Sequence, residues 1–317
     1  MKNTNKKYQS DKISSHEDAK VIHIPVLLDE VIEYLDPKPG EVYLDLTAGY
    51  GGHASKVLES TLQDQLHQAS LLIDRDQSAI DSLSKLFGQR PYLEITKNDF
   101  YSASKDLKKS KRHFDMILVD LGVSSPHLNI ASRGFSFVGL GPLDMRMDQT
   151  QAKTAEEVVN SYSQRELESI LRAYGEEPKA KKISELIVQN RPIHTTHELA
   201  KLVARAWPGH SKINPATRTF QAIRIEVNDE LKQLENALPI WIDLLAPGGR
   251  LAIITFHSLE DRIVKRFLSD VAGDRYDTEL TLLTKRPIQG TQKEIAFNPR
   301  ARSAKLRVVK NKNKERG

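Results

Sequence analysis

The sequence predicts an α/β protein with a mostly parallel, Rossmann-like sheet into which a domain of helices is inserted. Up to residue 137, and again after residue 216, short apolar segments alternate with segments of helical period. This alternation is typical of right-handed βαβ units, whose strands run parallel. Between these two regions the chain is polar, helical in period and rich in Lys and Glu, without a β-branched run. We therefore expect one sheet built from both ends of the chain.

The elements of the first region follow from their apolar patterns and from the residues that interrupt them. A helical pattern over 26–35 ends where proline and glycine follow at 37–40. The mainly apolar run MILVDLGV at 116–123 is typical of a buried strand. In order along the chain, the remaining segments are strands at 41–46, 70–76 and 92–99, and helices at 54–65 and 78–87.

The later elements are justified in the same way. Thr154 and Glu157 have the spacing of a capping box, so a helix is expected to begin there. Over 228–245 the apolar residues recur at intervals of three and four, which predicts a helix that Pro239 should kink. The remaining segments are a turn at 246–250, a helix at 259–268, and strands at 251–256, 279–285 and 304–310.

These patterns predict five consecutive regions. They are a polar flexible tail at 1–22, the first part of the sheet domain at 23–137, a helical insertion at 138–216, the second part of the sheet domain at 217–310, and a basic tail at 311–317.

The chain contains no cysteine, which excludes several kinds of site. There can be no disulfide, no thiolate zinc site and no iron–sulfur cluster held by cysteines. The ten histidines show no metal-binding spacing, so no metal is expected. A thiolate that would attack a pyrimidine ring and activate its C5 carbon is also excluded. If this protein methylates a pyrimidine, it should act on an exocyclic nitrogen or an oxygen.

The net charge of +5 is concentrated at the two ends of the chain. Residues 299–317 hold eight Lys or Arg and one Glu, and residues 1–20 hold five Lys and three acids. This distribution favours a polyanionic partner, although two solvated tails would have the same composition. No apolar run approaches the roughly 18–20 residues that span a bilayer, and the N-terminus lacks a signal-peptide pattern. We expect a cytoplasmic protein without membrane contact.

A glycine-rich loop, DLTAGYGGH (45–53), follows the first strand and opens a helix. Glycines allow close approach of a ligand to the backbone, and a helix N-terminus presents free N–H groups. Asp74 ends the second strand, 22 residues after Gly52, where an acid can bind a ribose diol. Ala48 and Tyr50 interrupt the G-x-G-x-x-G pattern. The loop therefore predicts a nucleoside-containing cofactor, with a dinucleotide and S-adenosylmethionine both open.

Asp120 is the candidate catalytic residue, because it ends the fourth strand, where ligands of open α/β sheets bind. The amino group of cytosine or adenine is a poor nucleophile, and methyl transfer builds positive charge on its nitrogen. Acceptors such as Asp120, or the backbone carbonyls of residues 121–125, could stabilise that charge. The alternative is that Asp120 only caps a neighbouring loop.

Six residues are candidates for substrate binding, each with a structural alternative. Aromatic rings can hold an unstacked base, or they can pack under a loop. Arginines can contact phosphate or form ion pairs, and a histidine near the amine could be a core residue. The candidates are Arg133, Phe135, Phe137, Arg218, Arg224 and His257.

Taken together, these residues resemble the bacterial RsmH or MraW family of small-subunit ribosomal RNA methyltransferases. The resemblance spans nearly the whole chain. The blocks that carry it are HIPVLLDEV (23–31), DLGVSSP (120–126), RGFSF (133–137), GPLDMRMD (141–148), YGEE (174–177), PATRTFQAIRI (215–225), APGGRL (246–251), FHSLEDRIVK (256–265) and NPRARSAKLR (298–307).

The resemblance implies a class I methyltransferase fold that uses S-adenosylmethionine to methylate the exocyclic amine of a cytosine in the decoding region of 16S ribosomal RNA. It implies that the insertion recognises RNA and that the partner is this RNA or the small ribosomal subunit. A homodimer stays an open alternative. The cofactor contacts that it carries over are Gly51, Gly52, His53, Asp74, Phe100, Asp120 and His127.

Two positions depart from the related patterns. His127 stands where the family usually has Gln, so this contact is the least secure. Amino-methyltransferases often carry Pro-Pro-aromatic after the acid of the fourth strand, whereas here Leu121 and Gly122 follow Asp120. Our hypothesis is that Phe135 or Phe137 replaces the missing aromatic.

Three rival functions remain open at the level of sequence. A nicotinamide-dependent oxidoreductase would need a cleaner pyrophosphate loop. A non-catalytic ribosome-assembly factor would bind RNA without transferring a methyl group. A methyltransferase that acts on a protein or a small molecule fits the basic ends less well.

Overall fold

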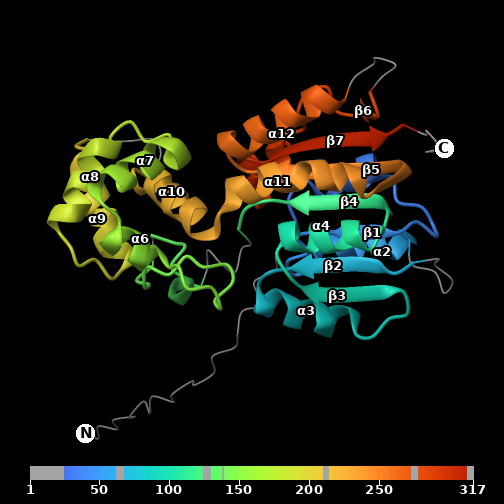
Figure 1. The fold of residues 1–317 in the computed structure, drawn as a ribbon, viewed down its shortest axis with the longest axis horizontal. Coiled ribbons are helices and arrows are strands. Elements are labelled where there is room, and N and C mark those ends of the chain that lie inside the picture. The colour runs from blue at the N-terminus through green and yellow to red at the C-terminus, as the bar shows by residue number, and fades with distance from the viewer. Residues whose placement is uncertain are drawn as a thin grey trace, which may run out of the picture.

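The structure, a computed structural model, describes residues 25–61, 68–123, 130–137, 139–209, 214–272 and 278–312. His127 lies outside these ranges, as do the N-terminal tail and most of the predicted C-terminal tail. Two bodies lie side by side in Figure 1, a sheet with helices on its faces and a separate cluster of helices. Within the described ranges, none of the helices combines the length and the apolar character that crossing a bilayer requires.

The sheet has seven strands in the order β3-β2-β1-β4-β5-β7-β6. The first five strands of this order run parallel, and β7 is antiparallel to both β5 and β6. Both ends of the chain contribute strands, so the α/β class predicted from the sequence is confirmed. The strands are β1 (Tyr43–Asp45), β2 (Ser70–Asp74), β3 (Leu93–Lys97), β4 (Phe114–Asp120), β5 (Leu245–Thr255), β6 (Leu280–Leu282) and β7 (Lys305–Asn311).

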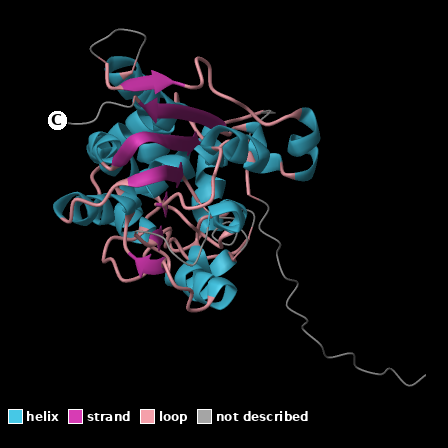
Figure 2. Ribbon diagram, turned by 90° about the vertical axis from the view of Figure 1, so that its right-hand side faces the viewer, coloured by secondary structure: helices cyan, strands magenta, loops and turns pink. Residues whose placement is uncertain are grey.

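Helices cover both faces of this sheet (Figure 2). Side chains alternate between two hydrophobic clusters along β4, where Ile117 joins one cluster and Leu118 the other. The first cluster includes residues of α4, α11 and α12, and the second includes residues of α1, α2 and α3. The helices are α1 (Leu28–Leu35), α2 (Gly52–Thr61), α3 (Gln77–Phe87), α4 (Phe100–Lys109), α11 (Glu230–Asp243), α12 (Ser258–Val271) and α13 (Gln292–Phe297).

Two features of the sheet body differ from the sequence predictions. Helix α4 was not predicted, because its sequence is mostly polar and only Ala103 and Leu107 join the core. The segment 246–250, predicted as a turn, is part of β5, which pairs with β4 through a register shift. At the other end, β7 continues through Asn311, and the Lys312 amide donates to the Glu279 carbonyl.

The helical cluster has its own hydrophobic core, with residues between Phe135 and Val227. Thr154 caps the first helix as the sequence predicted, by accepting from the Glu157 amide at 3.1 Å. Its helices are α6 (Ala155–Ser161), α7 (Gln164–Gly175), α8 (Ala180–Gln189), α9 (Thr196–Ala206) and α10 (Ala216–Asn228).

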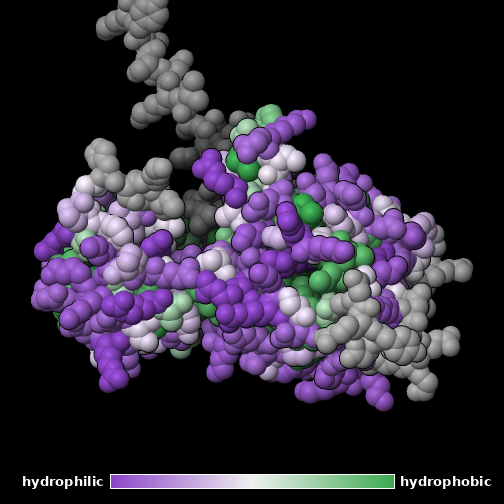
Figure 3. All heavy atoms as spheres, turned by 90° about the horizontal axis from the view of Figure 1, so that it is seen from above, coloured by the Kyte–Doolittle hydropathy of each residue, from purple (hydrophilic) through white to green (hydrophobic). Residues whose placement is uncertain are grey.

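The last of these helices, α10, packs with the cluster rather than with the sheet. It approaches α7 so closely that a Cβ on Gly175 would lie 2.7 Å from the Arg218 carbonyl oxygen. Packing therefore favours a boundary near Asn228, later than the boundary at 216 that the sequence suggested. The face in Figure 3 is mainly hydrophilic over both bodies, with apolar residues exposed over the sheet body.

Candidate functional site

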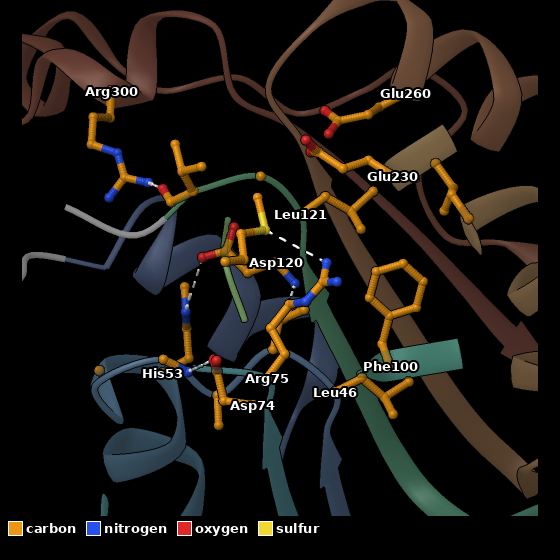
Figure 4. Close-up of a pocket in the computed structure, with 18 residues that line it drawn as sticks. Leu46, His53, Asp74, Arg75, Phe100, Asp120, Leu121, Glu230, Glu260 and Arg300 are labelled. Carbon is orange, nitrogen blue, oxygen red and sulfur yellow. Dashed lines mark hydrogen bonds and ion pairs between the residues drawn. The ribbon is translucent and has the colours of Figure 1, made fainter. Parts of the chain in front are cut away.

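A pocket of roughly 940 Å³ opens at the carboxyl ends of β1, β2 and β4 (Figure 4). The loop after β1, the first residue of α4, and residues of α11 and α12 line it. Arg300, from the short 3-10 helix η2 (Pro299–Arg302), also lines it. Five of the expected cofactor residues lie in this lining, namely Gly52, His53, Asp74, Phe100 and Asp120.

The glycines of the loop after β1 are needed for their backbone and for close packing. Gly49 and Gly51 have φ angles of 52° and 82°, in the left-handed region that favours glycine. A Cβ on Gly52 would lie 3.0 Å from Pro25, and a Cβ on Gly51 would lie 2.9 Å from Leu86. Gly52 lines the pocket, whereas Gly51 faces this packing contact, so any contact of Gly51 with the cofactor stays a prediction.

Asp74 is fixed at the end of β2 by two backbone amides. Its Oδ2 accepts from the Gly49 amide and its Oδ1 from the Asp76 amide, each at 2.8 Å. Phe100 lies nearby in the pocket, and its ring meets Trp241 edge-on with the centroids 5.7 Å apart. A carboxylate and an apolar ring therefore line the same pocket, as the binding of a nucleoside requires.

Asp120 lies at the centre of the pocket (Figure 4). Its amide donates to Thr47 Oγ1 at 2.6 Å, and its Oδ2 lies 3.9 Å from His53 Nδ1. Its Oδ1 is buried and has no hydrogen-bond partner among the described residues. Burial raises the pKa of Asp120 to about 7, and the charges of Asp45 and Glu260 add to the rise while that of Arg300 opposes it.

The acids Glu230 and Glu260 form another part of the lining. Arg224 donates two hydrogen bonds of 2.8 Å to the carboxylate of Glu230. His257 caps α12 by accepting from the Glu260 amide through Nδ1. Burial opposes the charge of Glu260, but His257, Arg224 and the Phe256 amide outweigh it, so the pKa of Glu260 is lowered. Arg224 and His257 therefore have the ion pair and the helix cap that the sequence offered as structural alternatives, and any contact of either residue with substrate stays a prediction.

The other predicted substrate residues also lie outside this lining. Phe135 is buried in the helical cluster, and the ring of Phe137 meets Phe220 with the centroids 5.2 Å apart. The packing alternative thus describes both rings, and the hypothesis that they hold a base has no support in their placement. Arg218 is exposed and donates to the Glu176 carbonyl, so a contact of Arg218 with phosphate stays a prediction.

Arg133 is buried and holds a segment that borders the pocket. It donates to Asp76 at 3.0 Å and to the carbonyls of Arg146 and Met147 at 3.1 and 2.9 Å. These carbonyls belong to the segment 144–148, which we call the strap, and Met147 lines the pocket. Arg133 therefore positions a wall of the pocket, and any contact of Arg133 with RNA stays a prediction.

Asn228 holds the strap from the helical cluster. Its Oδ1 accepts from the Met147 amide at 2.9 Å, and its Nδ2 donates to the Met145 carbonyl at 2.8 Å. From the sheet body, Lys97 pairs with Asp148 at 3.6 Å. The strap is thus fixed to both bodies of the protein.

Sequence reasoning missed several residues that line the pocket, among them Arg75, Met147, Glu230, Glu260 and Arg300. Met147, Glu260 and Arg300 do lie in blocks that carried the family resemblance. Their approach to Asp120 depends on tertiary structure, which the spacing of these blocks does not contain. Within the described ranges, no three His, Asp or Glu side chains gather as a metal-binding group would.

Comparison with known proteins supports the same family. The model of the MraW methylase family matches residues 20–312. A Cyanothece protein named ribosomal RNA small subunit methyltransferase H is 48% identical over 94% of this chain and 97% of its own length. Proteins of the same name from Trichormus variabilis and Heliobacterium mobile are 44% and 42% identical. They align with 96% and 90% of this chain, and with 97% and 98% of their own lengths.

A family match over almost the whole chain, with full-length relatives at this identity, leaves one assignment. The rival class of nicotinamide-dependent oxidoreductases is set aside by it. The chain belongs to the MraW methylase family, and it is an S-adenosylmethionine-dependent methylase as its sequence predicted.

Proposed function

We propose that this protein methylates the exocyclic amine of a cytosine in the decoding region of 16S ribosomal RNA, by direct in-line transfer. The observation that carries the proposal is Asp120, a buried carboxylate with an unpartnered Oδ1 in the described structure, at the centre of the pocket. The names of the relatives support a small-subunit RNA substrate. The absence of cysteine supports attack by the amine rather than by a ring carbon.

The residues of the pocket fit S-adenosylmethionine. Asp74 would accept hydrogen bonds from ribose hydroxyls, and Phe100 would pack beside the nucleoside. A Cβ on Gly52 would lie 3.0 Å from Pro25, so close packing fixes the loop that borders the pocket. Glu230 and Glu260 give the pocket a negative character that suits a sulfonium cation. The bound cofactor supplies an electrophilic methyl group.

The role of Asp120 follows from the chemistry of an amine. As its nitrogen gains a methyl group it becomes positive, and a carboxylate that accepts from its N–H stabilises this charge. The nitrogen must then lose a proton. A pKa of about 7 allows Asp120 to be ionised before the reaction and to accept the proton afterwards. Its buried position strengthens both effects, because little water screens the charge.

His53 is fixed beside Asp120 by its other ring nitrogen. His53 Nε2 lies 2.9 Å from the Val26 carbonyl, and a carbonyl can only accept, so Nε2 carries hydrogen. Its Nδ1 lies 3.9 Å from Asp120 Oδ2, so His53 borders the carboxylate that would face the amine.

The test uses small ribosomal subunits from a strain that lacks the enzyme. The protein is incubated with these subunits and labelled S-adenosylmethionine, and the RNA is digested to nucleosides. We expect label in amino-methylated cytidine, and none with Asp120→Asn. Label in another nucleoside would contradict the cytosine assignment. No label, despite measured cofactor binding, would favour the ribosome-assembly factor. Cytoplasmic localisation belongs to the same proposal.

A further inference from the structure

Arg300 enters the pocket next to Asp120 and has no role in the proposal above. It comes from η2, some 180 residues after Asp120 in the chain, and it lines the pocket beside the end of β4. Figure 4 shows Arg300 and the two glutamates on one side of Asp120, and His53 and Asp74 on the other. The residue therefore lies on the side of Asp120 away from the loop that would hold the cofactor.

Two contacts fix the direction of the Arg300 side chain. Its Nη2 donates to the Val123 carbonyl, just beyond β4. Its Cζ lies 5.6 Å from the centroid of the Phe256 ring, within the range of a cation–π interaction. Phe256 is fixed in turn, because its amide donates to Glu260 at 2.8 Å and its ring lies against Gly122. A guanidinium is thus held against the wall formed by the ends of β4 and β5.

A donor and an acceptor consequently line the same pocket. Asp120 offers a buried oxygen that has no partner in the described structure and can only accept when ionised. Arg300 carries a planar fork of N–H groups that can only donate. The two charges interact, since Arg300 opposes the rise in the pKa of Asp120. A ligand that satisfies both side chains needs a hydrogen-bond donor next to a hydrogen-bond acceptor along one edge.

We propose that Arg300 is a specificity-determining residue that reads the target base by donating to N3 and O2 of the cytosine. Asp120 accepts from the amine of the same edge. Uracil has an oxygen where cytosine has the amine, and an N–H at N3, so it would oppose both side chains. A site built to hydrogen-bond one edge rejects the other strongly, because its buried groups lose their partners. Phe256 is a positioning residue that holds the guanidinium. The inference rests on the proposed function.

The experiment measures the binding of cytidine and of uridine to the full-length protein saturated with S-adenosylhomocysteine, by titration in NMR. Nucleosides carry no phosphate, so general attraction to RNA does not contribute. We expect the wild type to prefer cytidine by about tenfold or more, as a charged hydrogen bond allows. Arg300→Met should reduce the preference to about twofold or less. Arg300→Lys, which keeps the charge and one donor, should retain part of it.

Two matched controls come from the same region of the chain. Arg302 lies on η2 but is exposed and does not line the pocket, so Arg302→Met removes the same charge and should keep the preference. Phe297 is 74% exposed at the end of α13. Phe297→Leu should likewise have no effect, whereas Phe256→Leu should weaken the preference for cytidine.

Three results would overturn the inference. They are a wild type without preference, an Arg300→Met variant that keeps the preference, and an Arg300→Met variant that loses only S-adenosylhomocysteine binding. The last would assign Arg300 to the cofactor. Methyl transfer to small subunits is measured on the same preparations. If the wild type labels cytosine while Arg300→Met keeps the preference, only this inference fails. If the wild type binds the cofactor but labels nothing, the proposed function fails.

Discussion

Replacing Asp120 with asparagine should stabilise the protein at alkaline pH while it stops methyl transfer. Burial raises the pKa of Asp120 from its ordinary value of 3.8 to about 7. Between these values the folded state binds more protons than the unfolded state, so stability falls as pH rises. Each pKa unit corresponds to about 1.4 kcal/mol, so ionised Asp120 destabilises the fold by about 4 kcal/mol at pH 8. Asparagine removes this charge at every pH.

The gain will be smaller than the full amount, because the buried amide also needs partners. An unsatisfied buried polar group costs about 1–3 kcal/mol. This leaves a gain of about 1–3 kcal/mol at pH 8, or about 2–6 °C in Tm at roughly 2 °C per kcal/mol. At pH 5.5 the unfolded Asp120 is ionised and must take up a proton on folding, which costs about 2 kcal/mol, so the gain should be about 2 kcal/mol smaller there than at pH 8.

The assay is thermal unfolding of wild type and Asp120→Asn at pH 5.5 and pH 8, beside single-turnover methyl transfer. The control is Asp243→Asn, which removes a carboxylate from an ion pair with Lys108 on the surface. Such a pair contributes little to stability, so its loss should change Tm only slightly. A difference between wild type and Asp120→Asn that is equal at both pH values would refute the reasoning. So would full turnover by the variant.

Three further predictions follow from the same structure. The single-turnover rate of the wild type should rise about tenfold from pH 6 to pH 8, as Asp120 ionises around pH 7; a flat profile would exclude it as the acceptor. Asp74→Ala should mainly weaken S-adenosylmethionine binding and leave the saturated rate close to wild type, which equilibrium binding beside single-turnover rates will separate. Arg133→Met should destabilise the fold by about 3–5 kcal/mol, because it leaves Asp76 buried without its cation, and denaturant unfolding should show recovery when Asp76→Asn is added.

The parts of the fold that the sequence predicted are those with a local cause. The residues at 116–119 are all apolar because both faces of β4 are buried there, and this pattern can be recognised in the sequence alone. Helix α4 was missed because its sequence is mostly polar: of its ten residues only Ala103, Ser104 and Leu107 are buried. The start of β5 was missed because glycine and proline at 247–249 indicate a turn. These residues do leave the ladder, since Phe114 pairs with Leu245 and Met116 next pairs with Arg250.

The residues of the candidate site likewise divide into those that the sequence identified and those whose contacts only the structure shows. Asp74 and Asp120 could be found because they end strands, and strand ends of a parallel sheet meet at one edge. For Arg133, Arg224 and His257 the sequence offered both a substrate contact and a structural role, and it did not identify the partners that the structure shows. Arg133 pairs with Asp76, which lies 57 residues earlier. No local sequence pattern predicts an ion pair between residues this far apart in the chain.

The strap has a consequence for how the two substrates of the enzyme affect one another. It is fixed by Asn228 on one side and by Arg133 on the other, and Met147 within it borders the pocket. A movement of the helical cluster on contact with RNA would therefore shift a wall of the cofactor site. Thermodynamic linkage makes such an effect reciprocal: the factor by which RNA changes cofactor affinity is the factor by which cofactor changes RNA affinity. The strap would then couple the binding of the cofactor to the binding of RNA.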